Sequence, residues 1–192
     1  FDIPIKCINP QELIQKIKVA SEPFSPIFTS NLNEVFISDK NYLDLFTRLL
    51  DTIEKSYYKQ EAEVLGFKTV WTEEFQSVFL NTFSNGKVLF IIRDPRSTIA
   101  SSFAIHNHRY PLEFLIRQWR KSVFYALMFT EISQKFKDKC ILIKYEELIQ
   151  NPHLSITKIL NFLDLKLEKS LLEPSNFRDG KNEKWVQNTS YD

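Results

Sequence analysis

An arginine and a serine set about two helical turns apart are the residues with the clearest chemical use. Arg93 follows the apolar run Val88–Ile92, Pro95 comes two residues later, and Ser101 lies eight residues after Arg93. Such a run predicts a buried strand, and proline fits the first turn of a helix. A guanidinium and a hydroxyl there, with the free N–H groups at the helix start, are suited to hold a phosphate. Alternatively, Arg93 pairs with Asp94 and Ser101 bonds to its own helix backbone.

Helices and short apolar runs alternate along the chain, and these elements must position Arg93 and Ser101. Apolar runs predict strands at 64–68, 88–92 and 140–144. Helical spacing and capping signals predict helices over about 10–20, 40–60, 73–82, 112–135, 146–150 and 154–163, and one that begins at Pro95. Residues 21–33 are predicted as loop, Asn85–Gly86 as a turn, and the tail from Leu171 as irregular.

This order predicts an α/β protein whose three strands lie in one parallel sheet, flanked by helices on both faces. In such sheets the ligand sits beyond the carboxyl ends of the strands, where Arg93 is expected. On the helix over 112–135, aromatic residues at helical spacing predict a core face rather than an acceptor pocket: Trp119, Phe124, Tyr125 and Phe129.

The composition is that of a globular protein: 192 residues, of which 43% are hydrophobic and 26% charged. A net charge of +1 gives no global field for nucleic acid or a membrane surface. No apolar run approaches the roughly 20 residues of a membrane helix. The spacing of His, Asp and Glu indicates no metal site. Cys7 and Cys140 are predicted to be buried free thiols, with a disulfide as the alternative.

The segment Val88–Phe103 resembles the 3′-phosphate-binding segment of the sulfotransferase superfamily. In that family a strand leads into Arg-Asp-Pro and a helix with serine at the eighth position, and this Arg and Ser hold the 3′-phosphate of 3′-phosphoadenosine-5′-phosphosulfate (PAPS). The resemblance implies these roles for Arg93 and Ser101. It also implies a PAPS-dependent sulfotransferase (EC 2.8.2 type) with a P-loop-kinase-like fold that needs no metal.

Two later segments agree with this resemblance. Residues 144–152 are similar to the family's Tyr-Glu-Asp-Leu element, which implies that Tyr145 lies near the nucleotide. Residues 177–185 resemble a degraded Phe-Arg-Lys-Gly-x-x-Gly-Asp-Trp motif, which implies that Arg178 and Gly180 close over the same phosphate. Asp179 stands where the family often has lysine, and Lys181 could compensate for its charge. The alternative for this tail is an ordinary charged loop.

The pair Lys68-Thr69 is a candidate for the chemical step. Lys68-Thr69 resembles a pair found in many family members, and Lys68 is expected to stabilise charge during transfer, or else to be an exposed lysine at a strand end. The cytosolic branch carries its catalytic histidine directly after this pair, where this chain has Val70.

Transfer needs a base, and the residue types that can serve include Glu34 and Glu61 upstream of Lys68, and His106 and His108 after the Ser101 helix. Each could equally be a surface residue.

The family's glycine-rich 5′-phosphosulfate loop is not found, because no glycine precedes Gly66. Either the chain begins after that loop or it is a divergent member; we expect the former. Residues 1–192 are therefore interpreted as a single sulfotransferase-like domain that lacks its first strand and this loop, incomplete at the N-terminus.

Three functions compete: a sulfotransferase, a non-catalytic sulfotransferase-like domain that keeps a 3′-phosphonucleotide site, and a nucleotide kinase-like protein. The kinase is disfavoured because no Gly-x-x-x-x-Gly-Lys-[Ser/Thr] sequence occurs. The acceptor, whether a small molecule, carbohydrate, lipid or peptide, is not indicated, nor is the oligomeric state. The cytoplasm is the default location, with an upstream anchor or signal left open.

Overall fold

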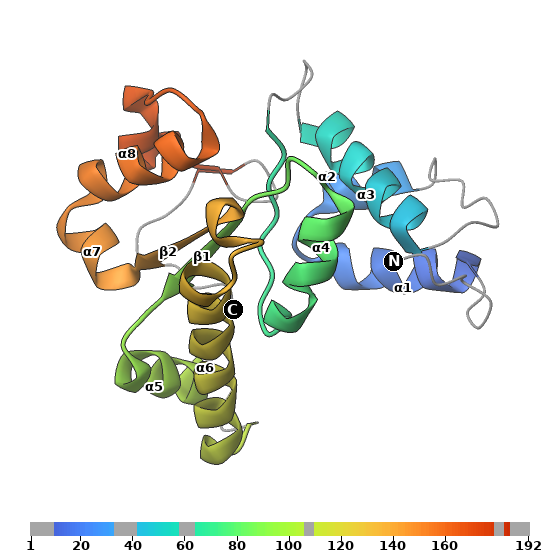
Figure 1. Ribbon diagram of the computed structural model, residues 1–192. Helices are drawn as coiled ribbons and strands as arrows, with labels where there is room; N and C mark the ends of the chain where they lie inside the picture. Colours follow the sequence, from blue (N-terminus) through green and yellow to red (C-terminus); the bar gives the residue numbers. More distant parts are fainter. Residues whose placement is uncertain (1–9, 33–41, 58–63, 106–109, 179–182, 185–192) are drawn as a thin grey trace. The chain divides into compact units, whose positions relative to one another are not determined.

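The computed structural model describes residues 10–32, 42–57, 64–105, 110–178 and 183–184 (Figure 1). These residues belong to two compact units. The first comprises the described residues up to Lys68 and from Pro174 on, and the second runs from Thr69 to Glu173. Each unit is described by itself.

The first unit contains α1 (Pro10–Ser21), α2 (Pro26–Asn31) and α3 (Tyr42–Tyr57). Polar contacts join these helices: the hydroxyls of Ser21 and Thr29 lie 2.7 Å apart, and Asn31 Nδ2 donates to Ser56 Oγ at 2.8 Å. Helix α2 falls within the stretch predicted as loop, so that prediction is wrong. Pro26 occupies the start of the helix, where proline is tolerated, rather than interrupting one.

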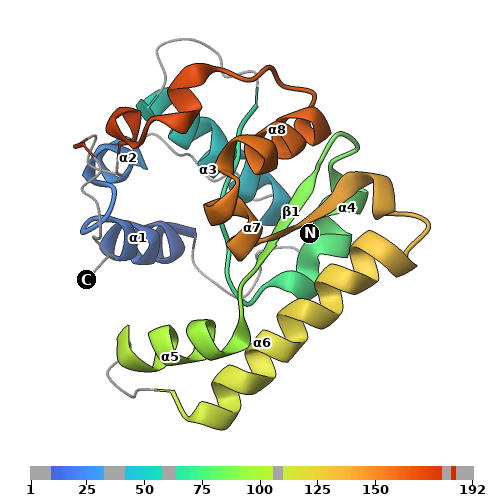
Figure 2. The ribbon, with the colours of Figure 1, turned by 90° about the vertical axis from the view of Figure 1, so that its left-hand side faces the viewer.

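The second unit holds the elements around Arg93. In chain order they are a 3₁₀ turn (Glu73–Phe75), α4 (Gln76–Thr82), β1 (Val88–Ile92), α5 (Pro95–Ile105), α6 (Leu112–Leu127) continued by a π-helical turn (Met128–Ile132), β2 (Cys140–Lys144), α7 (Tyr145–Gln150) and α8 (Pro152–Leu163). Figure 2 shows α5 following the end of β1 directly, with the longer α6 next to it. The protein is thus α/β, with mostly helices.

Strands β1 and β2 pair in parallel, in a register that runs from Val88 opposite Cys140 to Ile92 opposite Lys144. Both strands have the predicted bounds. The predicted third strand is wrong, because residues 64–69 adopt no regular structure. Phe67 of that segment makes an edge-to-face contact with Phe46 of α3, at 5.3 Å between ring centroids. Phe67 therefore packs against a helix of the first unit and not within a sheet.

The core of the second unit lies against one face of this sheet. Its buried members are Leu80, Val88, Phe90, Ala126, Phe129, Phe136 and Cys140. Burial raises the pKa of the Cys140 thiol to about 11, and the free buried thiol agrees with the prediction, whereas Cys7 lies outside the described residues. On the opposite face of β1, Leu89 and Ile91 are 36% and 52% exposed. The expectation that β1 is buried on both faces is therefore wrong: its side chains alternate between buried and exposed.

The aromatic residues of α6 and its π-helical extension are only partly a core face. Phe129 is 1% exposed and stacks on Phe90 at 6.0 Å between ring centroids. Phe124 is 59% exposed, so its predicted burial is wrong. Trp119 and Tyr125 are half-buried. Positions 124 and 129 differ because the turns of the helix carry them to different faces.

Replacing Phe129 with alanine is expected to lower the free energy of unfolding by about 3–5 kcal/mol, because it opens a cavity between β1 and the end of α6. The matched control is Phe124→Ala in the exposed position nearby, with an expected loss below about 1 kcal/mol. Urea unfolding followed by circular dichroism measures both. Equal losses for the two variants would contradict this description of the core.

Candidate functional site

The parallel register brings Arg93 next to Tyr145. Because Ile92 pairs with Lys144, the residues that follow the two strands leave the sheet at the same edge. The Arg93 guanidinium carbon lies 4.8 Å from the centre of the Tyr145 ring, in a cation–π contact. Arg93 is exposed, so its donor groups face solvent at the carboxyl edge of the sheet.

Asp94 pairs with Arg96 and not with Arg93. Oδ1 of Asp94 accepts from the backbone N–H and Nε of Arg96 at 2.8 and 3.1 Å, and Oδ2 accepts from its terminal nitrogen at 2.9 Å. Ser97 N also donates to Oδ1, at 3.4 Å, and Thr98 N to the Asp94 carbonyl at 2.9 Å. Asp94 is therefore the N-cap of α5. The hydrogen bond from Arg96 lowers the pKa of this carboxyl from 3.8 to about 2.

This cap corrects one expectation from the sequence. The first N–H groups of α5 were expected to be free for an anion, but those of Arg96 and Ser97 are bonded to the Asp94 side chain. An anion at this edge would therefore have to rely on side chains, chiefly on the guanidinium of Arg93.

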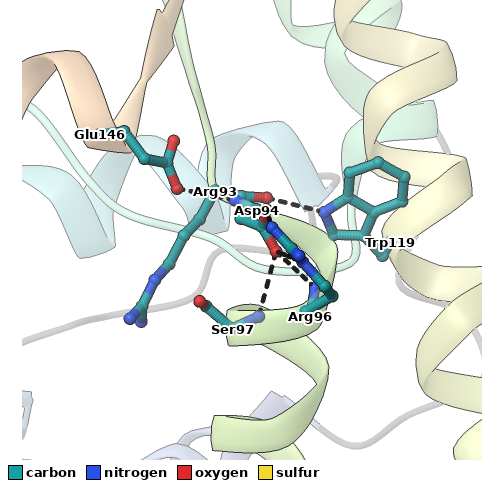
Figure 3. A network of polar contacts seen from close by, with 6 residues as sticks. All are labelled: Arg93, Asp94, Arg96, Ser97, Trp119 and Glu146. Carbon is teal, nitrogen blue, oxygen red and sulfur yellow. Dashed lines mark hydrogen bonds and ion pairs between the residues drawn. The ribbon is translucent and has the colours of Figure 1, made fainter.

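The Arg93–Asp94 peptide is bonded on both sides by side chains of other helices (Figure 3). Nε1–H of Trp119, on α6, donates to the Arg93 carbonyl at 3.0 Å. Oε1 of Glu146, on α7, accepts from the Asp94 N–H at 2.8 Å, and this bond is the main cause that lowers the pKa of Glu146. In Figure 3 the Arg93 side chain points away from Trp119, and no dashed line reaches its guanidinium.

Ser101 lies on α5 beyond Ser97, and its side chain is half-buried. Among the described residues, neither the Ser101 hydroxyl nor the Arg93 guanidinium has a hydrogen-bond partner. Helical hydroxyls elsewhere behave differently: Thr82, Thr130 and Thr157 each donate to the carbonyl four residues earlier at 2.8 Å. The two internal alternatives weighed for Arg93 and Ser101, an ion pair with Asp94 and a bond to the helix backbone, are thus not what the structure contains.

Two further candidates belong to the first unit. Lys68 is exposed at the end of that unit's segment 64–68. Arg178 is also exposed, and its backbone forms an antiparallel bridge with Lys184. Both residues belong to the first unit, whereas Arg93, Ser101 and Tyr145 belong to the second.

The residues that follow Lys68-Thr69 are anchored on α6. Lys121 Nζ donates to the Trp71 carbonyl and to Glu74 Oε2, both at 2.9 Å. Trp71 has a positive φ of 62°, a conformation that non-glycine residues adopt at a cost, and its ring contacts Tyr110 and Phe114 edge-on. The lysine and the aromatic rings together stabilise this turn.

Six other candidates lie outside the described residues: Glu34, Glu61, His106, His108, Gly180 and Lys181. Within the part of the chain that the structure describes, no group of His, Cys, Asp and Glu is arranged to hold a metal ion. Likewise, no helix in that part is both long and apolar enough to cross a membrane.

Sequence reasoning missed Trp119 and Glu146 as partners of Arg93. Glu146 carried a signal, because it directly follows Tyr145 in the segment already singled out. Trp119 carried none, since it lies 26 residues from Arg93 and its helical spacing indicated only a core position. The contact depends on how α5 and α6 pack together.

Comparison with known proteins identifies the family of this chain. Residues 20–169, more than half of the chain, match the sulfotransferase family, and the chain belongs to that family. Among characterised proteins it is similar to the protein-tyrosine sulfotransferase of Drosophila melanogaster, with 27% identity over 115 residues. The match covers 55% of this chain and 22% of that protein, so the chain spans well under half of its relative.

The Asp94 cap gives a prediction for pH. Because the folded-state pKa of about 2 lies below the ordinary 3.8, the ionised carboxylate stabilises the fold above pH 3.8, and this contribution is lost as the pH falls toward 2. Asp94→Asn keeps a capping side chain but not the charge. Urea unfolding from pH 6 to 2.5 should show the wild type to be more stable at pH 6, with the difference shrinking below pH 4. If the difference in unfolding free energy between the wild type and Asp94→Asn stays constant from pH 6 to 2.5, the ionised Asp94 cap does not stabilise the fold.

Proposed function

We propose that this chain carries the 3′-phosphate site of a PAPS-dependent sulfotransferase, which transfers the sulfuryl group to a hydroxyl or amine. The observation that carries the proposal is the Arg93 guanidinium at the sheet edge, stacked on Tyr145 and without a hydrogen-bond partner among the described residues while Arg96 pairs with Asp94. Membership of the sulfotransferase family supports the reaction class.

The chemistry of these side chains fits the proposed ligand. A guanidinium offers parallel N–H donors that match two oxygens of one phosphate, and a serine hydroxyl can donate to a third. The Tyr145 ring holds the guanidinium on one side and leaves its edge for the anion. Tyr145 would then also lie close to the nucleoside, as the resemblance implies.

In the proposed reaction the acceptor oxygen or nitrogen attacks the sulfur of PAPS. The bond from sulfur to the 5′-phosphate oxygen breaks, and adenosine 3′,5′-bisphosphate leaves with that electron pair. The proton of the acceptor passes to a base, for which Glu34, Glu61, His106 and His108 are the candidates. Lys68 would stabilise the charge on the leaving phosphate. The reaction needs no metal in this proposal.

The remaining family features complete the proposal. Arg178, Gly180 and Lys181 would fold over the 3′-phosphate, so that a second guanidinium neutralises the charge that Arg93 leaves. Glycine at position 180 would allow the backbone to approach closely. The chain would form a single P-loop-kinase-like domain, with its sheet flanked by helices on both faces.

The tyrosyl side chain of a peptide is the first acceptor to test, because the Drosophila relative is named for that substrate. A carbohydrate, lipid or other small-molecule hydroxyl or amine is the alternative. A non-catalytic domain that binds a 3′-phosphonucleotide is the competing function, because the glycine-rich 5′-phosphosulfate loop is not found in the sequence.

Replacing Arg93 with alanine in the complete protein is expected to weaken binding of adenosine 3′,5′-bisphosphate about 10- to 150-fold, because a charge-assisted phosphate contact is lost. Isothermal titration calorimetry measures the affinity. The matched control is Arg117→Ala, which removes an exposed arginine from α6 and should change the affinity less than about twofold. Equal affinity in the Arg93 variant and the wild type would remove Arg93 from the site.

Transfer of radiolabelled sulfate from PAPS separates the enzyme from the non-catalytic domain. We expect label on a peptide tyrosine or on another hydroxyl or amine acceptor in a panel, and little label with Arg93→Ala at subsaturating PAPS. Binding of the bisphosphate without transfer to any acceptor would favour the non-catalytic function.

A further inference from the structure

Both polar groups of a single peptide unit are held by side chains from two different helices. The carbonyl of Arg93 accepts from Trp119 Nε1–H on α6, and the N–H of Asp94 donates to Glu146 on α7. These two groups belong to the same peptide plane, between Arg93 and Asp94. A rotation of that plane would break both bonds at once.

The Arg93–Asp94 peptide lies between β1 and α5, outside the hydrogen bonds of both the strand and the helix. The pairing of β1 with β2 ends at Ile92 opposite Lys144, and α5 begins at Pro95. The peptide plane fixes ψ of Arg93 and φ of Asp94, and therefore the direction in which α5 leaves β1. Since Arg93 follows the strand and Ser101 is on the helix, this direction also sets the position of the guanidinium relative to the hydroxyl.

Glu146 is an unusual neighbour for an anion site, because its carboxylate would repel a phosphate. Its contact with the backbone gives it a different use: Oε1 accepts from the Asp94 N–H at 2.8 Å, and that bond is the main cause of its lowered pKa. The adjacent Glu147 makes no such contact and pairs instead with Lys144 at 3.5 Å. The role of Glu146 is therefore that of an acceptor, which a neutral glutamine could also fill.

We propose that Trp119 and Glu146 are positioning residues that orient the Arg93–Asp94 peptide and so align Arg93 and Ser101 on one phosphate. The inference rests on the proposed function, because it assigns a purpose to the arrangement of the two proposed phosphate ligands. Neither residue touches the nucleotide in this account. They should therefore affect the binding of the 3′-phosphate and not the binding of the rest of the nucleotide.

The test compares two probes, adenosine 3′,5′-bisphosphate and adenosine 5′-monophosphate, which lacks the 3′-phosphate. Trp119→Phe and Glu146→Ala in the complete protein should each weaken binding of the bisphosphate about 2- to 10-fold, the effect of one lost hydrogen bond. Binding of the monophosphate should stay unchanged. Glu146→Gln, which keeps the acceptor, should bind the bisphosphate at least as tightly as the wild type.

Glu147→Ala is the matched control for the glutamate, and Trp71→Phe for the tryptophan; both should leave the ratio of the two affinities unchanged. Equal weakening of both probes by Trp119→Phe or Glu146→Ala would show a merely structural role and overturn the inference. Glu146→Gln as weak as Glu146→Ala would overturn the role of Glu146 as an acceptor. If Trp119→Phe fails to fold, the glutamate series alone decides.

Titrations of Arg93→Ala with the same two probes distinguish a failure of the positioning role from a failure of the proposed phosphate site. Weak binding of the bisphosphate by Arg93→Ala, with wild-type binding by Trp119→Phe and Glu146→Ala, would overturn the positioning role and leave the site in place. Wild-type binding by Arg93→Ala would remove the site itself, and the positioning role with it.

Discussion

The parallel pairing of β1 with β2 is the constraint on which the candidate site depends. Its register ends at Ile92 opposite Lys144, so the two residues that follow, Arg93 and Tyr145, leave the sheet side by side. The ring of Tyr145 then supports the guanidinium at 4.8 Å. A shift of one residue in this register would turn one side chain to the opposite face and separate the pair.

At this edge of the sheet, the carboxylate of Asp94 pairs with Arg96 and not with Arg93. Asp94 is bonded to Arg96 and to the start of α5, so among the described residues the Arg93 guanidinium has no ion pair or hydrogen bond, although the nearby Glu146 carboxylate acts on it through its charge. An arginine that is held in place but has donors to spare is a good anion ligand, because little side-chain freedom is lost on binding. Asp94 therefore has two effects: it caps α5, and by pairing with Arg96 it leaves the Arg93 guanidinium available for an anion.

The sequence predicted most of the second unit, because strong local signals are sufficient there. The bounds of β1 and β2 follow from their β-branched apolar runs, and Pro95 marks a helix start, whereas α8 begins at Pro152, two residues before its predicted start. The segment 64–68 failed because Phe67 packs on α3, a contact that no local pattern reveals. For the site, the family resemblance selected Arg93, Ser101 and Tyr145, and the structure places Arg93 against Tyr145. The choice of Arg96 as the partner of Asp94, and the bond from Trp119, depend on side-chain geometry that residue types leave open.

The measurement that tests this account most directly is a crystal structure of the complete protein with adenosine 3′,5′-bisphosphate. We expect oxygens of the 3′-phosphate about 2.7–2.9 Å from the Arg93 guanidinium. Ser101 Oγ should bond to the same phosphate, and the bonds of Trp119 and Glu146 to the Arg93–Asp94 peptide should be retained. A nucleotide bound with its 3′-phosphate away from Arg93 would contradict the account.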